Sequence, residues 1–73
     1  MRKKITHSPL LGRRLYQARM AAGLTQEQVA QRLLVDRTTY TKYENGTVDP
    51  PLQMAYQISQ IFNVTLDELL KPE

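Results

Sequence analysis

Polar side chains with the spacing of one helix face lie between residues 36 and 45. If this segment is helical, Tyr40 and Tyr43 are three residues apart and point inward together. The residues left on the outer face are Arg37, Thr38, Thr41 and Lys42. Arginine can pair bidentately with guanine, lysine can donate to guanine or a phosphate, and threonine offers a hydroxyl or a methyl group to thymine. These four residues are therefore candidates for contacts with DNA base edges.

A second short helix precedes this segment and would position it. Thr25 with Gln28 three residues later forms a capping-box string, so a helix is expected to begin at Thr25. Leu34 and Val35 form a tight turn, after which Asp36 is the expected N-cap of the second helix. Two short helices joined by a tight turn make a helix-turn-helix, which places its second helix in the major groove of DNA.

The rest of the chain is expected to support that unit. Residues 1–7 are basic and without periodicity, which predicts a flexible arm, and residues 8–71 are expected to form one domain. Ser8-Pro9 begins a first helix with an inner stripe, and Gly23 ends it. The stripe consists of Leu11, Leu15, Ala18 and Ala22. Asn45-Gly46 and the prolines at 50 and 51 separate the helix that follows Asp36 from the next helix.

The fourth and fifth helices complete the predicted fold. The inner stripe of the fourth helix is Leu52, Ala55, Ile58 or Ser59, and Phe62. Asn63 breaks that helix, Val64 enters the core, and Thr65 with Glu68 caps a short last helix. The sequence therefore predicts an all-α fold, a compact five-helix bundle with a central helix-turn-helix.

Composition argues against several other classes of protein. The chain has 73 residues and no cysteine, and its one histidine, His7, lies in the arm. Neither a metal site nor a His-based catalytic triad is therefore expected. The glycines are isolated, which leaves no glycine-rich phosphate loop, and Asp67-Glu68 open a helix instead of forming a catalytic pair. We expect no enzyme activity, no cofactor and no small-molecule ligand.

No apolar run approaches the roughly 20 residues that cross a bilayer, and Gly12-Arg13-Arg14 interrupts any signal peptide after the basic N-terminus. A cytoplasmic, nucleoid-associated protein is therefore predicted.

Charge is distributed unevenly along the chain. Positions 1–43 hold nine basic and two acidic residues, and positions 44–73 hold one lysine and five acidic residues, which together give the net charge of +3. A basic half is typical of a polyanion binder, although a solvated basic face would have the same composition. The arm residues Arg2, Lys3 and Lys4, with Arg13 and Arg14, could add screened attraction to DNA.

From Leu11 to Leu70 the chain resembles the phage repressor and Cro family of helix-turn-helix domains, often called XRE-like. The resemblance is carried by Arg19, GLTQEQVAQRL at 23–33, RTTYTKYENG at 37–46, Pro50 with Leu52, and NVTLDELL at 63–70. It implies that Arg37, Thr38, Thr41 and Lys42 contact bases. It also implies phosphate contacts from Thr25, Gln26, Asn45, Thr47 and Arg19, and a structural ion pair between Arg19 and Glu44. Thr25 could equally act only as a helix cap.

Two residues depart from the family pattern. Position 34 is usually glycine because the turn needs a positive φ, and Leu34 would cost about 1–2 kcal/mol there. Either the turn has another shape or Leu34 gains from burial, for example at an interface. Asp36 places a carboxylate near the phosphates, where it could accept from cytosine or orient Arg37.

The resemblance predicts a transcriptional regulator, a repressor, that binds double-stranded DNA. One such unit makes few contacts, so we expect a homodimer on a pseudo-palindromic operator, formed through the C-terminal helices or only on the DNA. The alternative is a protein-interaction or antitoxin-like adaptor that keeps the fold, with a partner surface made by Leu66, Leu69 and Leu70. RNA binding is less favoured because most aromatic residues lie on apolar stripes.

Overall fold

The computed structural model describes residues 9–71, and this range contains five α-helices and no strand. The helices are α1 (Pro9–Ala22), α2 (Gln26–Leu33), α3 (Arg37–Asn45), α4 (Leu52–Phe62) and α5 (Leu66–Leu70). The predicted all-α, five-helix architecture is confirmed. The predicted arm at residues 1–7 and the predicted cap at Ser8 lie outside the described residues.

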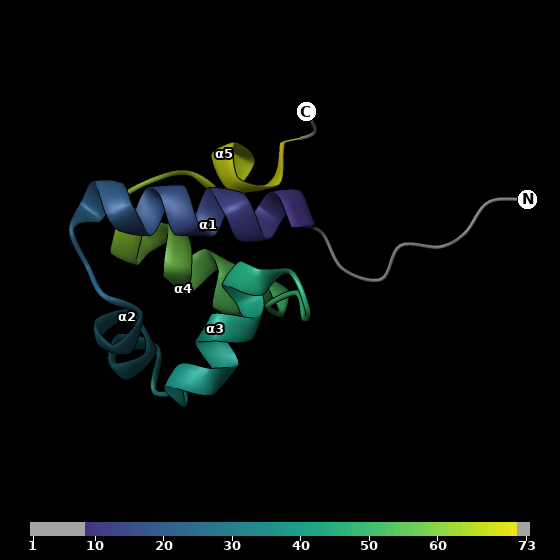
Figure 1. Cartoon of the computed structure of the whole chain (residues 1–73). Helices are drawn as coiled ribbons and strands as arrows, with labels where there is room; N and C mark the ends of the chain where they lie inside the picture. The colour runs from purple at the N-terminus through teal and green to yellow at the C-terminus, as the bar shows by residue number, and fades with distance from the viewer. Residues whose placement is uncertain (1–8, 72–73) are drawn as a thin grey trace, which may run out of the picture.

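The longest helix, α1, holds the other elements together. It packs against α3 and α4 on one side and against α5 on the other (Figure 1). α2 packs mainly against α3 and α4, and the loop at residues 23–25 joins it to α1. The pair α2–α3 is therefore supported from one side by α1 and α4.

A single cluster of buried side chains joins the five helices. Its members are Leu11, Leu15, Val29, Ala30, Leu33, Tyr40, Tyr43, Ile58, Phe62 and Leu69. Residues of the connecting loops pack against it, namely Leu24, Val35 and Val64. Each helix thus contributes at least one side chain to the core.

Two of the predicted stripes are too long. Ala22 is exposed, and Leu52 keeps 70% of its surface exposed, whereas Ala55, Ile58, Ser59 and Phe62 are buried. Ala22 and Leu52 are terminal residues of their helices. At both positions the periodic pattern continues beyond the part of the helix that has a neighbour.

Helix ends follow the sequence signals closely. Thr25 and Gln28 form a complete capping box at the start of α2, and Thr65 and Glu68 form another at the start of α5. Asn63 ends α4 in the left-handed region with φ 58°. These local devices fix the lengths of the short helices, which are too short to be stable alone.

One close approach between helices was not predicted. A Cβ atom on Gly12 of α1 would lie 2.4 Å from the backbone carbonyl oxygen of Glu44 in α3. Because no side chain can share that space, glycine is what allows the two helices to pack at this point. Within the described residues, no helix is both long and apolar enough to span a bilayer.

Candidate nucleic-acid interface

α3 is anchored by its inner face. Tyr40 is fully buried and Tyr43 is nearly so, and their rings meet edge to face with centroids 6.1 Å apart. Arg37, Thr38 and Lys42 are exposed on the other side of the helix. The inward tyrosines and the outward polar residues are therefore arranged as the spacing predicted, except that Thr41 is half-buried.

The C-terminal end of α3 is fixed to α1 by an ion pair. Nε of Arg19 donates to Oε2 of Glu44 at 2.6 Å, and Nη2 donates to Oε1 at 3.2 Å. Nη1 of Arg19 also donates to the carbonyl oxygen of Leu24 at 2.9 Å, and its guanidinium lies 5.4 Å from the centroid of the Tyr16 ring. Because both charged side chains are almost entirely buried, Arg19 is a structural residue here, with little surface left for a phosphate.

Gln26 extends this hydrogen-bond network to α2. Its Nε2 donates to Oε1 of Glu44 at 3.0 Å, and its Oε1 accepts from the Thr41 hydroxyl at 3.0 Å. The amide therefore joins α2 to α3, and the Glu44 carboxylate extends the network to α1. The amide still has a second N–H, but the Thr41 proton is committed to Gln26, so Thr41 can offer DNA only a lone pair or its methyl group.

The same contacts explain the titration of the buried groups. Burial alone would raise the pKa of Glu44, but hydrogen bonds from Arg19 and Gln26 and the charge of Arg19 outweigh it and lower that pKa. The hydrogen bond to Glu44 raises the pKa of Arg19. Burial raises the pKa of Tyr40, so its hydroxyl stays protonated. The pair is thus charged at neutral pH.

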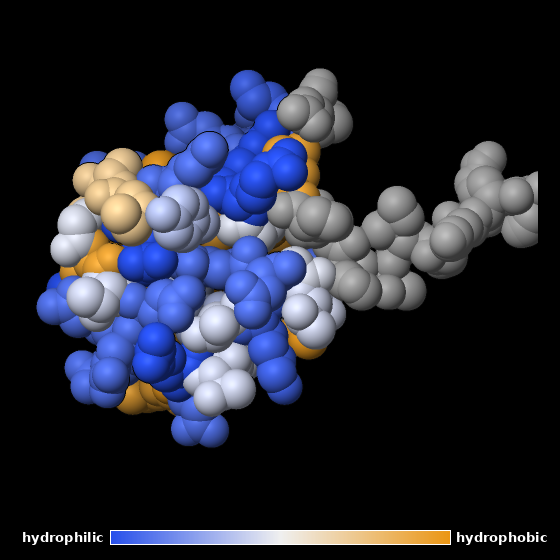
Figure 2. Space-filling model, in the orientation of Figure 1, coloured by the Kyte–Doolittle hydropathy of each residue, from blue (hydrophilic) through white to orange (hydrophobic). Residues whose placement is uncertain are grey.

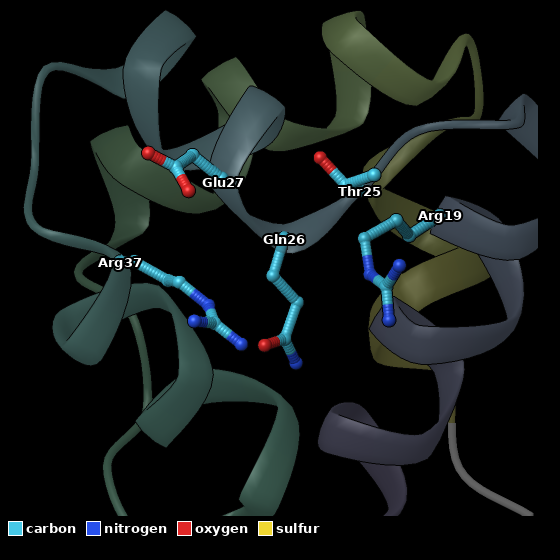
Figure 3. A pocket seen from close by; sticks show the side chains of 5 residues that line it. All are labelled: Arg19, Thr25, Gln26, Glu27 and Arg37. Carbon is cyan, nitrogen blue, oxygen red and sulfur yellow. The ribbon is translucent and has the colours of Figure 1, made fainter.

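A depression of about 440 Å³ lies between the N-terminal ends of α2 and α3. Its lining residues are Arg19, Thr25, Gln26, Glu27 and Arg37. In Figure 3 the guanidinium of Arg37 extends from α3 toward the Gln26 amide, and Arg19 approaches from the opposite side. The depression therefore combines the exposed guanidinium of Arg37 with the start of a helix, whose free N–H groups favour an anion, whereas the Arg19 guanidinium beside it is already paired with Glu44.

Thr25 serves as the N-cap of α2. Its Oγ1 accepts from the backbone N–H of Gln28 at 3.0 Å, while its own N–H donates to the Gln28 side chain at 2.9 Å. The capping role, one of the two roles considered for this residue, is thus observed. The proton of its hydroxyl is not used in the capping box.

The turn between α2 and α3 has the left-handed shape usual for the family. Leu34 has φ 61° and ψ 40°, and 91% of its surface is exposed. The alternative that Leu34 gains from burial does not hold within this chain. Asp36 occupies the N-cap position of α3 as predicted, but its side chain makes no capping hydrogen bond.

The backbone N–H groups that follow α3 are already bonded within the chain. The N–H groups of Gly46 and Thr47 donate to carbonyl oxygens of Tyr43 and Lys42 at 3.2 and 3.1 Å. They close the last turn of α3 and are not free to bind a phosphate. The side chains of Asn45 and Thr47 are exposed, so any phosphate contact there would come from them.

The basic residues of α1 divide into two kinds. Arg13 is exposed, but Arg14 is half-buried and donates to the carbonyl oxygens of Glu68 and Lys71 at the end of α5. Arg14 therefore fixes α5 to α1, and its contribution to DNA attraction stays a prediction. Arg2, Lys3 and Lys4 lie outside the described residues. Within residues 9–71, no cluster of acidic or histidine side chains could hold a metal ion.

The sequence is similar to those of known regulators. A family model described as helix-turn-helix matches residues 15–69. The transcriptional activator BcrR of Enterococcus faecalis is 45% identical over 60 residues, which cover 82% of this chain and 29% of that protein. The regulator ImmR of Bacillus subtilis is 37% identical over 60 residues, which cover 82% of this chain and 47% of that protein. The chain thus spans less than half the length of these two relatives.

Solved structures share the arrangement of helices. The restriction-modification controller protein C.AhdI of Aeromonas hydrophila has a TM-score of 0.78 at 27% identity, covering 85% of this chain and 94% of that one. The P22 c2 repressor, solved with a synthetic operator, has a TM-score of 0.80 at 20% identity, covering 90% of this chain and all of that one, a likeness of fold alone. The solved structures share the fold, and the family match over residues 15–69 shows that the chain belongs to the XRE-type family of helix-turn-helix proteins.

Proposed function

We propose that this chain is a sequence-specific double-stranded DNA-binding transcriptional regulator that inserts α3 into the major groove. One observation carries the proposal: α1 and α2 hold the C-terminal end of α3 through the Arg19–Glu44–Gln26 network, while Arg37, Thr38 and Lys42 stay exposed. An exposed row of donors on a rigid helix is what base recognition needs, because disorder at the reading side chains would cost affinity.

The proposed contacts follow from position along α3. Arg37 and Thr38 stand at the N-terminal end, which lies nearest the bases in this motif, and Lys42 lies one turn further along. Arg37 is assigned a bidentate contact with guanine, and Lys42 a contact with guanine or a phosphate. Thr38 can offer its hydroxyl or methyl group. Thr41 is assigned only its methyl group or a hydroxyl lone pair.

Phosphate contacts would fix the position of α3 in the groove without reading sequence. Gln26 is assigned one such contact through its second amide N–H, beside the start of α2 and the depression that it helps to line. Thr25 shares that location, and Asn45 and Thr47 would serve a second phosphate from the far end of α3. These contacts would make binding weaken steeply with salt, because each neutralised phosphate releases counterions.

The proposal covers DNA binding and regulation without an enzymatic step, in the cytoplasm at the nucleoid. A relative of this chain is named an activator, and a protein with the same fold is named a repressor. Repression, the mode predicted from the sequence, therefore stays a prediction. So does the homodimer on a pseudo-palindrome with half-sites about 34 Å apart.

The adaptor alternative loses part of its support. It relied on a surface made by Leu66, Leu69 and Leu70, but Leu69 is 2% exposed and belongs to the core. Leu66 is half-buried, and Leu70, which is 50% exposed, is the one member of the three that stays on the surface. A single exposed leucine makes a poor partner surface.

The test is selection of bound sites from a random pool of double-stranded DNA, followed by fluorescence anisotropy on the enriched sequences. The wild-type protein should enrich one motif, and its affinity should fall linearly on a log–log plot against salt. Arg37→Ala should lose about 1–3 kcal/mol of discrimination at one base pair, because one bidentate contact is removed.

Arg32→Ala is the matched control, since Arg32 is also an exposed arginine but lies on α2. It should leave base preferences unchanged. If Arg37→Ala lowers affinity for all sequences equally, Arg37 does not read a base. If the wild-type protein enriches no sequence even at low salt, the proposed function is wrong.

A further inference from the structure

The turn between α2 and α3 carries the most exposed large apolar side chain of the described residues. Leu34 keeps 91% of its surface exposed, against 70% or less for the other exposed large apolar residues. Its backbone is also strained, because φ is 61° at a residue with a Cβ atom. In Figure 2 the lower edge of the molecule, where the α2–α3 loop lies, shows a small hydrophobic area among hydrophilic atoms. Backbone strain of this kind gathers at functional sites, so Leu34 is a candidate for a contact outside the chain.

The other exposed residues that could make such a contact have ordinary surroundings. Tyr16 of α1 already contacts a guanidinium group, and Met20 stands one turn after it on the same helix. Asp49 is exposed but already interacts with another group of the chain. The remaining exposed large apolar residues lie on or near α4 and α5, namely Val48, Leu52, Tyr56 and Leu70. None of these residues has a positive φ, and scattered apolar side chains on an unstrained backbone are normal at a surface.

We propose that Leu34 packs against the 5-methyl group of a pyrimidine in the major groove, beside the base pair that Arg37 contacts. The ligand is a stretch of duplex DNA with a thymine, or a 5-methylcytosine, at a fixed position next to the α3 contacts. This inference rests on the proposed function, because it requires α3 to lie in the major groove. It adds to that function a specificity-determining residue that lies outside the helix that reads the bases.

The position of Leu34 in the chain places it close to the bases. Three peptide steps lead from Leu34 to Arg37, so their two Cα atoms are at most about 11 Å apart. Base pairs follow each other every ~3.4 Å along the duplex, so Leu34 is within about three base pairs of the Arg37 contact. The loop that carries Leu34 adjoins the N-terminal end of α3, which lies nearest the bases in this motif. That loop lies on the opposite side of α1 from α5 (Figure 1).

The chemistry of the side chain selects a methyl group as its partner. Leucine has neither a donor nor an acceptor, so it cannot hydrogen-bond a base or a phosphate. On the major-groove edge of a base pair, the C5 methyl group is the apolar group that is available. Residues 32–37 carry two arginines and one aspartate, and this net positive charge favours a polyanion over an apolar protein surface. One side chain is also far smaller than the ~800 Å² that a stable protein interface buries on each partner.

The contact should have a measurable but modest effect on affinity. Burial of one methyl-sized group changes a binding constant about fourfold. Leu34→Gly removes the side chain, and glycine adopts the positive φ of this turn without strain. The variant should therefore fold, and it should bind DNA that lacks the methyl group as tightly as the wild-type protein does.

The experiment replaces each thymine of the selected motif in turn by deoxyuridine, which removes one 5-methyl group and keeps the base pairing. Fluorescence anisotropy compares the wild-type protein with Leu34→Gly, and Arg37→Ala identifies the base pair that Arg37 contacts. At one thymine within about three base pairs of that contact, the wild-type protein should lose about fourfold in affinity and Leu34→Gly should lose nothing. At the other thymines both proteins should respond equally, because those methyl groups belong to other side chains.

A second arm places cytosine or 5-methylcytosine at the same position. The wild-type protein should bind the methylated base about fourfold more tightly, and Leu34→Gly should bind the two equally. A response to the thymine methyl alone assigns the contact to thymine, and a response in both arms assigns it to the methyl group of either base. Leu34→Ala should lose the response, whereas Leu52→Ala, an equal truncation at another exposed leucine, should keep it.

Three results would overturn the methyl contact while the proposed function stands. The first is an equal response of the wild-type protein and Leu34→Gly at every position. The second is a selected motif without a thymine near the base pair that Arg37 contacts. The third is an equal loss of affinity in Leu34→Gly for DNA with and without the methyl group, because a methyl contact would spare the DNA that lacks it. Failure of the wild-type protein to enrich any motif would overturn the proposed function itself, before any thymine is replaced.

Discussion

The two ends of α3 differ in almost every physical respect. At the C-terminal end, Glu44 is buried and bonded to Arg19 and Gln26, and Gly12 lets α1 touch the backbone. At the N-terminal end, Arg37 is exposed and Asp36 makes no side-chain cap. The difference teaches that one helix can separate stability from recognition. Substitutions at one end should change folding, and substitutions at the other should change binding.

The largest effect is expected from Glu44→Ala. The substitution leaves the buried Arg19 charge without its partner, so the free energy of unfolding should fall by about 3–5 kcal/mol. At about 0.05–0.15 kcal/mol per residue, that is a large part of the stability of this domain. Urea denaturation followed by circular dichroism measures it.

The matched control removes a charge from the opposite end of the same helix. Arg37→Ala should change the free energy of unfolding by no more than about 0.5 kcal/mol, because Arg37 is exposed. Equal losses for the two variants would contradict the contrast between the ends. If Glu44→Ala does not fold at all, Glu44→Gln keeps an acceptor for Arg19 and should show an intermediate loss.

Gly12→Ala tests the close approach of α1 to the C-terminal end of α3. In an open helix position alanine stabilises relative to glycine by about 1 kcal/mol. Here the new Cβ would lie 2.4 Å from the Glu44 carbonyl oxygen, so α1 and α3 must separate. Overpacking of this kind costs about 1–3 kcal/mol, and the melting temperature should therefore fall. A rise in melting temperature would mean that α1 and α3 have room for the added methyl group and would contradict the close approach.

Acid should weaken the ion pair of Glu44, which fixes the C-terminal end of α3. The pKa of Glu44 is lowered in the folded protein, so its contribution is complete above the ordinary pKa of a glutamate, about 4.3. That contribution is lost as the pH falls through the lowered value. The free energy of unfolding should accordingly decrease below about pH 4, with a smaller decrease in Glu44→Gln. Parallel pH profiles for the two proteins would show that Glu44 does not carry the dependence.

Local and periodic features of this molecule could be predicted from the sequence. The inward pair Tyr40 and Tyr43 follows from a three-residue spacing, and the caps at Thr25 and Thr65 each depend on residues within one turn. Such features are decided by neighbours in the chain. The left-handed turn at Leu34 was expected from the family pattern, but neither of the two alternatives offered for its cost, another turn shape or burial of Leu34, is seen within this chain.

Features that depend on distant segments could not be predicted. The role of Gly12 requires knowing that α1 crosses α3 at Glu44, and Arg14 bonds to carbonyl groups 54 and 57 residues away. Periodicity also does not say where a neighbouring helix ends, which is why Leu52 was expected in the core. Among the candidate site residues, the bond from Thr41 to Gln26 had no sequence signal, since it depends on two side-chain conformations.

The smallest effect on the free energy of unfolding, a gain instead of a loss, is expected at Leu34, in the turn that precedes the N-terminal end of α3. Leu34 has φ 61°, which costs a residue with a Cβ about 1–2 kcal/mol, and its exposed side chain recovers nothing within this chain. Leu34→Gly removes that strain but adds entropy to the unfolded state, so a net stabilisation of about 0.5–1 kcal/mol is expected in urea. Asn63→Gly is the control, because asparagine tolerates its φ of 58° better and should gain less. If Leu34→Gly is more stable yet binds selected DNA more weakly, strain at this turn serves recognition. If Leu34→Gly is less stable than the wild type, the Leu34 side chain stabilises the fold. The N-terminal end of α3 would then contribute to stability as the C-terminal end does, contrary to the comparison.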